Sequence, residues 1–228
     1  MRSNYKNILV TGGCGFYGLA FVRYVNNVSN VRVIILDKLT YAANHGSIAG
    51  LQKDRVELVV SDIYDSDLLD QVVPGHEAII HYASESHNDN SIVDPCPFIK
   101  TNVEGTYQLL EAARRHHVRS HHISTDEVFG DLVLDDPRKL SEESPYRPSK
   151  PYSSSKAASD MLVRAWIRTY GLQASTSNCC NNNGPYQHPE KFIPHSIACV
   201  RRVERPKLYG DGLNVRDWIH VDDHARAV

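Results

Sequence analysis

The sequence predicts an α/β protein built on a Rossmann-type doubly wound parallel sheet. Short apolar runs alternate with segments of helical periodicity, which is typical of parallel strands joined by helices. The first run ends at a cluster of glycines, and a polar residue follows each of the next four. Ligands bind to open α/β sheets at these carboxyl ends of the strands. The residues in question are Gly12, Asp37, Asp62, Ser84 and Thr125.

Each strand is expected from a continuous apolar run, and each helix from apolar residues spaced three and four apart. The expected strands are 8–11, 31–36, 56–60, 78–81, 122–124 and 173–177. The expected helices of this part are 19–25, 65–73, 98–116 and 152–170.

The last quarter of the chain has a looser pattern. Residues 135–151 are rich in Pro, Ser and charge and are expected to form a loop. The run Asn-Asn-Asn-Gly-Pro at 181–185 predicts a turn-rich, irregular segment. A helix is then expected near 193–203, followed by short strands at 208–209 and 217–221 and a helix opened by Asp222-Asp223.

Composition excludes several classes of protein. The 228 residues are 41% hydrophobic and 23% charged, which is the profile of a globular protein. A net charge of -2 gives no general attraction to nucleic acid or to an anionic membrane, so neither is expected as a partner. No apolar run approaches the roughly 20 residues of a membrane span, and the first strand begins too early to leave room for a signal peptide.

The five cysteines predict reduced thiols and neither a disulfide framework nor a metal site. Their number is odd, and none of them shows the C-x-x-C spacing of a zinc site. Reduced thiols are typical of the cytosol, so a cytoplasmic location is expected.

The glycine cluster predicts a dinucleotide site. Gly13-x-Gly15-x-x-Gly18 matches the dinucleotide-binding fingerprint, and Gly12-x-x-Gly15-x-x-Gly18 matches its short-chain-dehydrogenase variant. The cluster follows an expected strand, precedes an expected helix, and has Asp37 nineteen residues after Gly18. An acidic residue there accepts hydrogen bonds from the ribose hydroxyls and repels a 2′-phosphate, so the expected cofactor is NAD rather than NADP.

Tyr152 and Lys156 form a candidate catalytic pair. They lie four residues apart, on one face at the start of an expected helix. A nearby ammonium stabilises a phenolate, so Lys156 is expected to lower the pKa of Tyr152 toward the working pH of a general base. Ser124-Thr125, at the end of an upstream strand, supplies a hydroxyl partner.

The most informative segment is Thr125-Asp126-Glu127. A simple alcohol dehydrogenase needs a hydroxyl next to its tyrosine, but it has no use for two adjacent carboxyl groups. Carboxyl groups that share a pocket have their pKa values pushed apart, which yields one acid and one base. Elimination of water requires such a pair.

These segments together resemble the dTDP-glucose 4,6-dehydratases, which belong to the extended short-chain dehydrogenase/reductase superfamily. The resemblance covers essentially the whole chain, and Ser-Thr-Asp-Glu-Val-Phe-Gly at 124–130 is its most specific motif. Other matching segments are 37–42, 83–87, 164–171, 178–186, 189–194 and 216–218.

The resemblance implies a reaction in three stages on dTDP-glucose. Tyr152 would take the C4 hydroxyl proton while NAD accepts the C4 hydride, and Thr125 would hydrogen-bond the C4 oxygen. Glu127 would then remove the C5 proton while Asp126 protonates the departing C6 hydroxyl. Return of the hydride to C6 would give dTDP-4-keto-6-deoxyglucose. Lys156 would bind the nicotinamide ribose.

The resemblance also implies two sets of binding residues. For NAD they are Gly12, Gly15, Phe16, Tyr17, Gly18, Asp37, Lys38, Leu39, Thr40, Asp62, Ile63, Ala83, Ser84, Glu85, Ser86, Thr101, Tyr152, Lys156 and Asn182. For the nucleotide-sugar they are Ser86, His87, Thr125, Asn181, Lys191, Phe192, Lys207, Tyr209 and Arg216.

A few residues depart from the family pattern. Cys14 and Tyr17 replace smaller and aliphatic residues in the glycine loop, and Tyr17 is expected to approach the pyrophosphate. Asn90 stands where the family usually carries Arg, and Asn183 where it carries Tyr. None of these positions supplies a catalytic group.

Two regions are expected. Residues 1–178 would form the NAD-binding Rossmann domain with its Tyr/Lys helix, and residues 179–228 part of a smaller substrate-binding region that is truncated at its C-terminus. The family also suggests a homodimer through helices 98–116 and 152–170.

Two other functions remain open at this point. One is a related NAD-dependent enzyme, such as a GDP-mannose 4,6-dehydratase or a UDP-glucuronate decarboxylase. The other is a non-catalytic NAD-binding fragment, although the intact catalytic residues argue against it.

Overall fold

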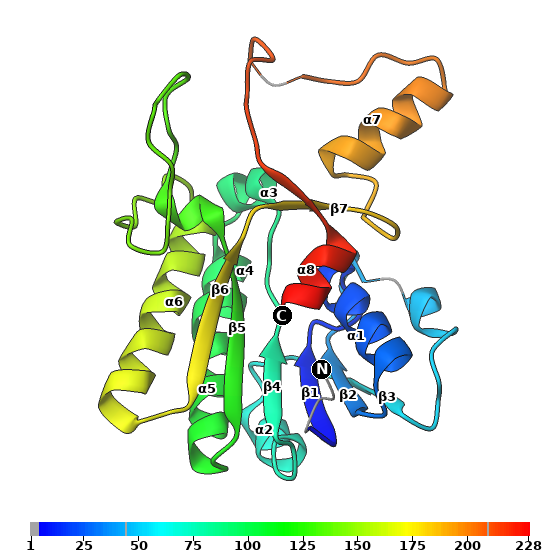
Figure 1. Ribbon diagram of the computed structural model, residues 1–228, viewed down its shortest axis with the longest axis vertical. Coiled ribbons are helices and arrows are strands. Elements are labelled where there is room, and N and C mark those ends of the chain that lie inside the picture. Colours follow the sequence, from blue (N-terminus) through cyan, green and yellow to red (C-terminus); the bar gives the residue numbers. More distant parts are fainter. Residues whose placement is uncertain (1–4, 44, 209) are drawn as a thin grey trace.

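The computed structural model of the protein describes residues 5–43, 45–208 and 210–228. Its centre is a parallel six-stranded sheet of order β3-β2-β1-β4-β5-β6, which confirms the predicted doubly wound fold (Figure 1). The strand order changes direction between β1 and β4, where a sheet of this kind opens a crevice for ligands. The strands are β1 (Asn7–Thr11), β2 (Arg32–Asp37), β3 (Val56–Val60), β4 (Ala78–His81), β5 (Arg119–Thr125) and β6 (Ala174–Cys179).

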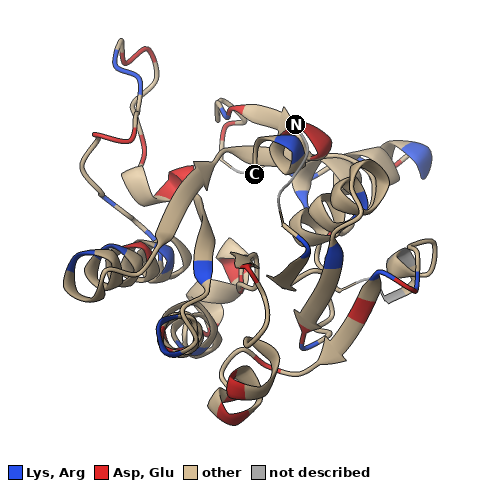
Figure 2. Ribbon diagram, turned by 60° about the horizontal axis from the view of Figure 1, so that its bottom comes forward, with Lys and Arg blue, Asp and Glu red and all other residues tan. Residues whose placement is uncertain are grey.

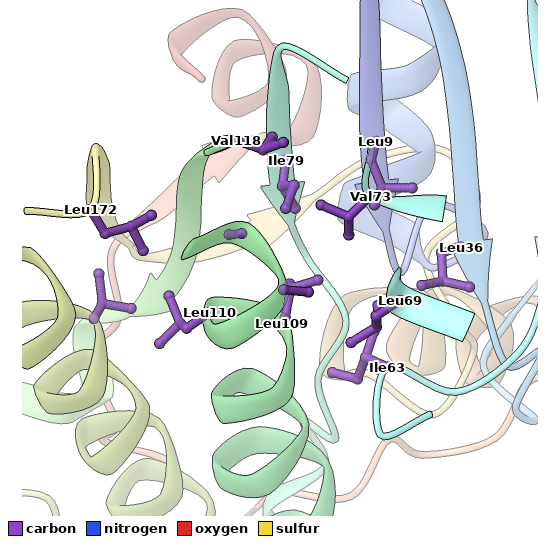
Figure 3. Close-up of a cluster of buried hydrophobic side chains, with 13 residues drawn as sticks. Leu9, Leu36, Ile63, Leu69, Val73, Ile79, Leu109, Leu110, Val118 and Leu172 are labelled. Atoms are coloured by element: carbon purple, nitrogen blue, oxygen red, sulfur yellow. The ribbon is translucent and has the colours of Figure 1, made fainter. Parts of the chain in front are cut away.

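Helices cover both faces of the sheet, and this explains why the central strands are apolar throughout. On one face, Leu9 and Ile79 of the sheet pack against Leu69 and Leu109 of the helices (Figure 3). On the other face, the cluster around Val10 includes side chains of α1 and α8. The helices are α1 (Phe16–Val28), α2 (Ser66–Val72), α5 (Thr106–Arg115), α6 (Pro151–Tyr170), α7 (Phe192–Arg201) and α8 (Val221–Ala227).

The long helix α6 has clear start and stop signals. Pro151 occupies its first position, where the missing N–H costs nothing. Gly171 ends it with φ 67°, a left-handed conformation that favours glycine. Tyr152 and Lys156 therefore lie in the first two turns of a well-defined 20-residue helix.

The segment expected as one helix at 98–116 is helical but not uniform. It begins as α4 (Cys96–Phe98), continues as π-helix over Ile99–Gly105 and becomes α5. π-Helical turns often occur at functional sites. The short helix α3 (Asn88–Val93) and the 3-10 turn Asp126–Phe129 were not expected from the sequence.

The expectation of irregular structure throughout 181–185 is wrong for its first three residues. β7 (Asn181–Asn183) pairs in parallel with β8 (Trp218–His220), and the two form a second, small sheet. Asparagine disfavours strands, but the pairing with β8 gives hydrogen-bond partners to the backbone of this run. Tertiary pairing therefore determines its secondary structure. Leu208 does not belong to a strand, and Tyr209 lies outside the described residues.

The end of the chain returns to the first half of the fold. Val221 and Ala225 of α8 are buried in the same cluster as Phe21 and Val22 of α1, and Figure 1 shows the two helices side by side. α7 instead lies apart from the main sheet. Acidic and basic residues are both scattered over the helices, strands and loops (Figure 2).

Candidate functional site

A cavity of about 440 Å³ lies at the carboxyl ends of the strands, where the sequence predicted the site. It brings together most of the predicted residues. Those that line it are Gly12, Gly15, Phe16, Tyr17, Gly18, Asp37, Lys38, Thr40, Asp62, Ile63, Ala83, Ser84, Glu85, Ser86, His87, Thr101, Thr125, Asp126, Glu127, Tyr152, Lys156, Asn181, Asn182, Lys191 and Phe192.

Three predicted residues do not line the cavity. Leu39, two residues after Asp37, has φ 54°; its N–H donates to Asp37 Oδ1, and its side chain packs against the core cluster around Val10. Lys207 and Arg216 are exposed on the segment between α7 and β8. Arg216 still lies near enough to Asp126 for its charge to favour that carboxylate. Tyr209, also predicted, lies outside the described residues.

The glycine loop is packed too tightly for side chains. Gly12 has φ 69°, and a Cβ there would lie 2.6 Å from the backbone nitrogen of Ala83. A Cβ at Gly18 would collide with Gly12 and lie 2.9 Å from Cα of Gly13. Gly15 is the N-cap residue of α1, and no described side chain caps this helix end. The cavity wall therefore presents helix N–H groups that suit a pyrophosphate.

The carboxylate of Asp37 ties the glycine loop to the end of β2. Its Oδ2 accepts a hydrogen bond from the Cys14 N–H at 2.9 Å, and its Oδ1 accepts one from the Leu39 N–H at 2.8 Å. Each oxygen keeps a lone pair, so the carboxylate can still accept from a ribose. Together with the glycine cradle, this acidic group fits NAD.

Lys38 links three further elements on the same side of the cavity. Its Nζ donates to Thr101 Oγ1 at 3.0 Å and lies 3.1 Å from Glu85 Oε1. Asp62 Oδ2 lies 3.8 Å away. Lys38, which follows β2, thus connects residues that follow β3 and β4 with the π-helical segment. All four of these residues are expected to bind NAD.

Asn102, in the π-helical segment, is a residue that sequence reasoning missed. Its Oδ1 accepts from Ser84 Oγ and from the Glu85 N–H, and its Nδ2 donates to Glu85 O and Ser155 Oγ, all at 2.9 Å. The amide thereby fixes the segment after β4 against α6. A buried asparagine within a helical pattern was the only signal in the sequence.

Tyr152 and Lys156 both line the cavity. The sequence predicted that the Lys156 ammonium would lie beside the Tyr152 phenol, but its hydrogen bonds go to other partners. Lys156 Nζ donates to the Ile123 carbonyl at 2.7 Å and lies 3.3 Å from His122 Nε2. Burial raises the pKa of Tyr152 well above its ordinary value, and the nearby Glu127 adds to this. The expected lowering of the Tyr152 pKa is therefore wrong for the side chains as they lie here, because desolvation dominates.

Burial also lowers the pKa of Lys156 to about 8, although the charge of Asp160 opposes the shift. Asp160 follows Lys156 by one turn and is 1% exposed. Its Oδ2 accepts from Ser124 Oγ at 2.7 Å and Tyr146 OH at 2.9 Å, and its Oδ1 lies 3.2 Å from His122 Nε2. This buried network under Lys156 was not anticipated.

The Thr-Asp-Glu segment forms a 3-10 turn directly after β5. Thr125 caps the turn: its Oγ1 accepts from the Glu127 N–H at 3.3 Å and donates to Asp126 Oδ1 at 3.2 Å. Burial raises the pKa of Asp126, and the charge of Glu127 raises it further. These effects shift Asp126 toward its protonated form, which is the direction that the acid of an elimination requires.

Glu127 sits in a different environment. Both of its carboxylate oxygens accept from Asn88 Nδ2, at 3.1 Å each. The ammonium of Lys191 is close enough to interact electrostatically with it. The two carboxyl groups are consecutive in one 3-10 turn, yet they have different partners: Asp126 accepts from Thr125, and Glu127 accepts from Asn88.

Tyr17 joins the glycine loop to the late part of the chain. Its hydroxyl accepts from the Asn182 N–H at 3.4 Å, and its ring meets His224 edge-on at 5.4 Å. Asn182 Oδ1 lies 2.9 Å from His224 Nδ1. The ring that was expected to approach the pyrophosphate is therefore engaged with β7 and α8 as well as lining the cavity.

Neither a metal cluster nor a membrane-spanning helix is present among the described residues. They contain no group of three or more His, Cys, Asp or Glu arranged to hold a metal ion. They also contain no helix that is both long and apolar enough to cross a membrane.

The comparisons with known proteins agree with this geometry. Residues 8–228 match the family described as "NAD dependent epimerase/dehydratase family". The chain is 55% identical over 222 residues to a dTDP-glucose 4,6-dehydratase of Mycolicibacterium smegmatis, covering 97% of this chain and 67% of that protein.

Solved structures show the same relationship. DesIV, a dTDP-glucose 4,6-dehydratase from Streptomyces venezuelae solved with NAD and TYD bound, is 46% identical with a TM-score of 0.92, over 96% of this chain and 70% of that one. The dTDP-glucose 4,6-dehydratase of Bacillus anthracis, in complex with NAD, is 40% identical with a TM-score of 0.88, over 97% and 70%.

Proposed function

Since this chain belongs to the NAD dependent epimerase/dehydratase family, we propose that it is an NAD-dependent lyase that converts dTDP-glucose to dTDP-4-keto-6-deoxyglucose and water. The observation that carries this proposal is the pair Asp126-Glu127 at the end of β5, beside Tyr152. An oxidoreductase or epimerase acting only at C4 needs the tyrosine and its hydroxyl partner. Only an elimination also needs a buried acid and a separate base.

Tyr152 acts first, as the base that takes the C4 hydroxyl proton. Its buried phenol resists ionisation, so a positive charge has to come near, and Lys156 one helical turn away is the group this chain supplies. Thr125, at the end of β5, hydrogen-bonds the C4 oxygen. NAD held in the cavity would accept the C4 hydride and later return it to C6, while Glu127 gives the C5 proton back.

The 4-keto group makes the C5 proton acidic, and Glu127 removes it. The electrons of the C5–H bond form the C5–C6 double bond as the C6–O bond breaks. Asp126, whose burial favours the protonated form, donates its proton to the departing oxygen, so that water leaves. Acid and base are thus supplied by consecutive residues.

The late part of the chain holds the substrate in this proposal, with residues 1–178 as the NAD-binding domain and 179–228 as part of the substrate-binding region. Lys191 and Phe192 line the cavity, and Lys191 and Arg216 suit a diphosphate by their charge. Tyr209 and Lys207 are proposed as further substrate contacts.

We also propose that the protein is a cytoplasmic homodimer that pairs through α5 and α6. Those helices carry exposed apolar side chains, among them Tyr107, Met161 and Tyr170. All five cysteines are free, in keeping with a reducing compartment. Analytical ultracentrifugation of the parent and of Met161→Lys tests the pairing; a parent that sediments as a monomer would refute it.

The activity is tested by incubating the protein with dTDP-glucose and NAD and measuring the alkali-induced absorbance of the 4-keto-6-deoxy product. GDP-mannose and UDP-glucuronate are tested in parallel. Product from dTDP-glucose alone supports the proposal. Turnover of only a GDP- or UDP-sugar would overturn the substrate, and NAD binding without turnover of any sugar would overturn the enzyme assignment.

The assignment of the base has its own test. Glu127→Gln keeps the size of the side chain but cannot take the C5 proton. It should still reduce bound NAD on mixing with dTDP-glucose and then stop. A Glu127→Gln variant that forms product at the parent rate would show that Glu127 is not the base.

A further inference from the structure

Asn88 makes the most direct protein contact with Glu127. It is the first residue of α3, and its amide nitrogen lies 3.1 Å from each oxygen of the Glu127 carboxylate. Both side chains line the cavity. One amide group from the segment after β4 therefore spans the carboxylate of the turn after β5.

The orientation of this amide depends on the charge of Glu127. With the amide reversed, its oxygen would face two carboxylate oxygens, and an ionised Glu127 would be repelled. With Nδ2 toward Glu127, one N–H lies between the two oxygens and is shared by them, so the contact is attractive. The observed contact thus places a hydrogen-bond donor between the two oxygens of the Glu127 side chain and restricts the direction in which that side chain faces.

The other end of the amide carries a local cost. Asn88 Oδ1 is buried and has no hydrogen-bond partner among the described residues. An unpaired buried acceptor is unfavourable for folding, and an apolar side chain would serve packing alone better. The contact with the Glu127 carboxylate, and not packing, therefore explains an asparagine at this position.

Lys191 has a different effect on the same carboxylate. Its ammonium interacts with Glu127 electrostatically, but it also donates to the Ser86 carbonyl at 3.4 Å. A point charge on a long side chain favours ionisation without fixing a direction. The short amide of Asn88, held at the start of a helix, restricts the orientation of the carboxylate plane.

We propose that Asn88 is a positioning residue for the elimination: it holds the carboxylate of Glu127 in one orientation for removal of the C5 proton. This rests on the proposed function, in which Glu127 is the base. Asn88 takes no part in the hydride transfer at C4. Its loss should therefore slow the second stage of the reaction and leave the first unchanged.

The test compares Asn88→Leu, which removes both donors at similar volume, with Asn88→Asp, which places a second carboxylate against Glu127. Asn90→Leu is the matched control, because Asn90 lies two residues away on α3, is exposed and does not line the cavity. Rapid mixing with dTDP-glucose follows reduced nicotinamide, and product is measured in the same samples.

Asn88→Leu should reduce bound NAD at a rate within about twofold of the parent but form product about tenfold or more slowly, because a hydrogen bond to a charged group is lost. Reduced nicotinamide should then accumulate, and substrate deuterated at C5 should show a larger isotope effect than with the parent. Asn88→Asp should be slower still, and Asn90→Leu should match the parent.

Other outcomes separate the two proposals. Parent-like product formation and isotope effect in Asn88→Leu would overturn the role of Asn88, with the proposed function intact. Equal slowing of NAD reduction and product formation would also overturn it, because a general structural defect acts on both stages. Failure of the parent to act on dTDP-glucose would overturn the proposed function itself.

Discussion

The ammonium nitrogen of Lys156, a residue that lines the cavity, lies 3.3 Å from Nε2 of His122, and both side chains are buried. Burial lowers the pKa of His122 to about 4, so the imidazole is neutral at neutral pH. The positive charge next to the catalytic tyrosine is therefore carried by Lys156, and the charge that balances it inside the protein is Asp160.

This arrangement predicts a basic limit to activity that depends on Asp160. Because the pKa of Lys156 is lowered to about 8, Lys156 is charged below that pH and neutral above it, so kcat/KM should fall above about pH 8. Asp160→Asn removes the charge that raises the Lys156 pKa and should move this limit down by about one pH unit.

Profiles of kcat/KM against pH for the parent, Asp160→Asn and Asp160→Glu check this prediction. Asp160→Glu keeps the charge and should retain the parent's basic limit more closely than Asp160→Asn. A basic limit that stays in place in Asp160→Asn would contradict the coupling between Asp160 and Lys156.

Gly18→Ala should damage both stability and NAD binding. The added Cβ would lie 2.9 Å from Gly13 Cα and overlap Gly12, so the loop has to move. Overpacking of this kind costs about 1–3 kcal/mol. Gly50→Ala, where the new Cβ would meet no heavy atom within 4 Å, is the control. Urea unfolding and NAD titration by calorimetry measure both effects; equal affinity in the two variants would count against the glycine cradle.

Asn102→Ala should lower stability by about 2–4 kcal/mol, since several buried hydrogen-bonding groups lose their partner at once. It should also weaken NAD binding, because the segment of Ser84 and Glu85 that lines the cavity is no longer held. Glu104→Ala, on the exposed side of the same π-helical segment, is expected to behave like the parent. The two variants are compared by urea unfolding with and without NAD.

Stability should fall as the pH drops from about 6.5 to 4. The unfolded chain protonates His122 near its ordinary pKa of 6.5, whereas the folded chain does so only near 4. In that window the unfolded state binds more protons, so acid favours unfolding, by about 3 kcal/mol for this residue alone. Urea midpoints at several pH values should decline less steeply in His122→Gln; an unchanged slope would argue against a neutral buried His122.

The parallel sheet and the position of the site could be predicted because they depend on local patterns. Strands that are buried on both faces consist mainly of apolar residues, so runs such as Ile8–Thr11 mark the strands. The polar residues that follow these runs mark the strand ends. Gly12 and Gly18 could be predicted for a similar reason, since the tight turn between strand and helix leaves no room for a Cβ at either position. The adjacent carboxyl groups of Asp126 and Glu127 needed no structure to be found.

Long-range contacts decided the rest. Asn181–Asn183 forms a strand because its backbone pairs in parallel with β8, although asparagine does not favour strands. Asn88 gained a role because Glu127 lies 39 positions away in sequence but 3.1 Å away in space.

The sequence by itself thus determined the chemical groups, the strands that carry them and the cofactor they suit. Only the tertiary structure decided the charge states, because burial and partners from other elements set them. The pKa of Tyr152 shows this most clearly: Lys156 follows it by one helical turn, yet desolvation raises the pKa while the ammonium contacts Ile123 and His122. Spacing along a helix places two groups near each other, but solvent exclusion and competing partners determine what each group does.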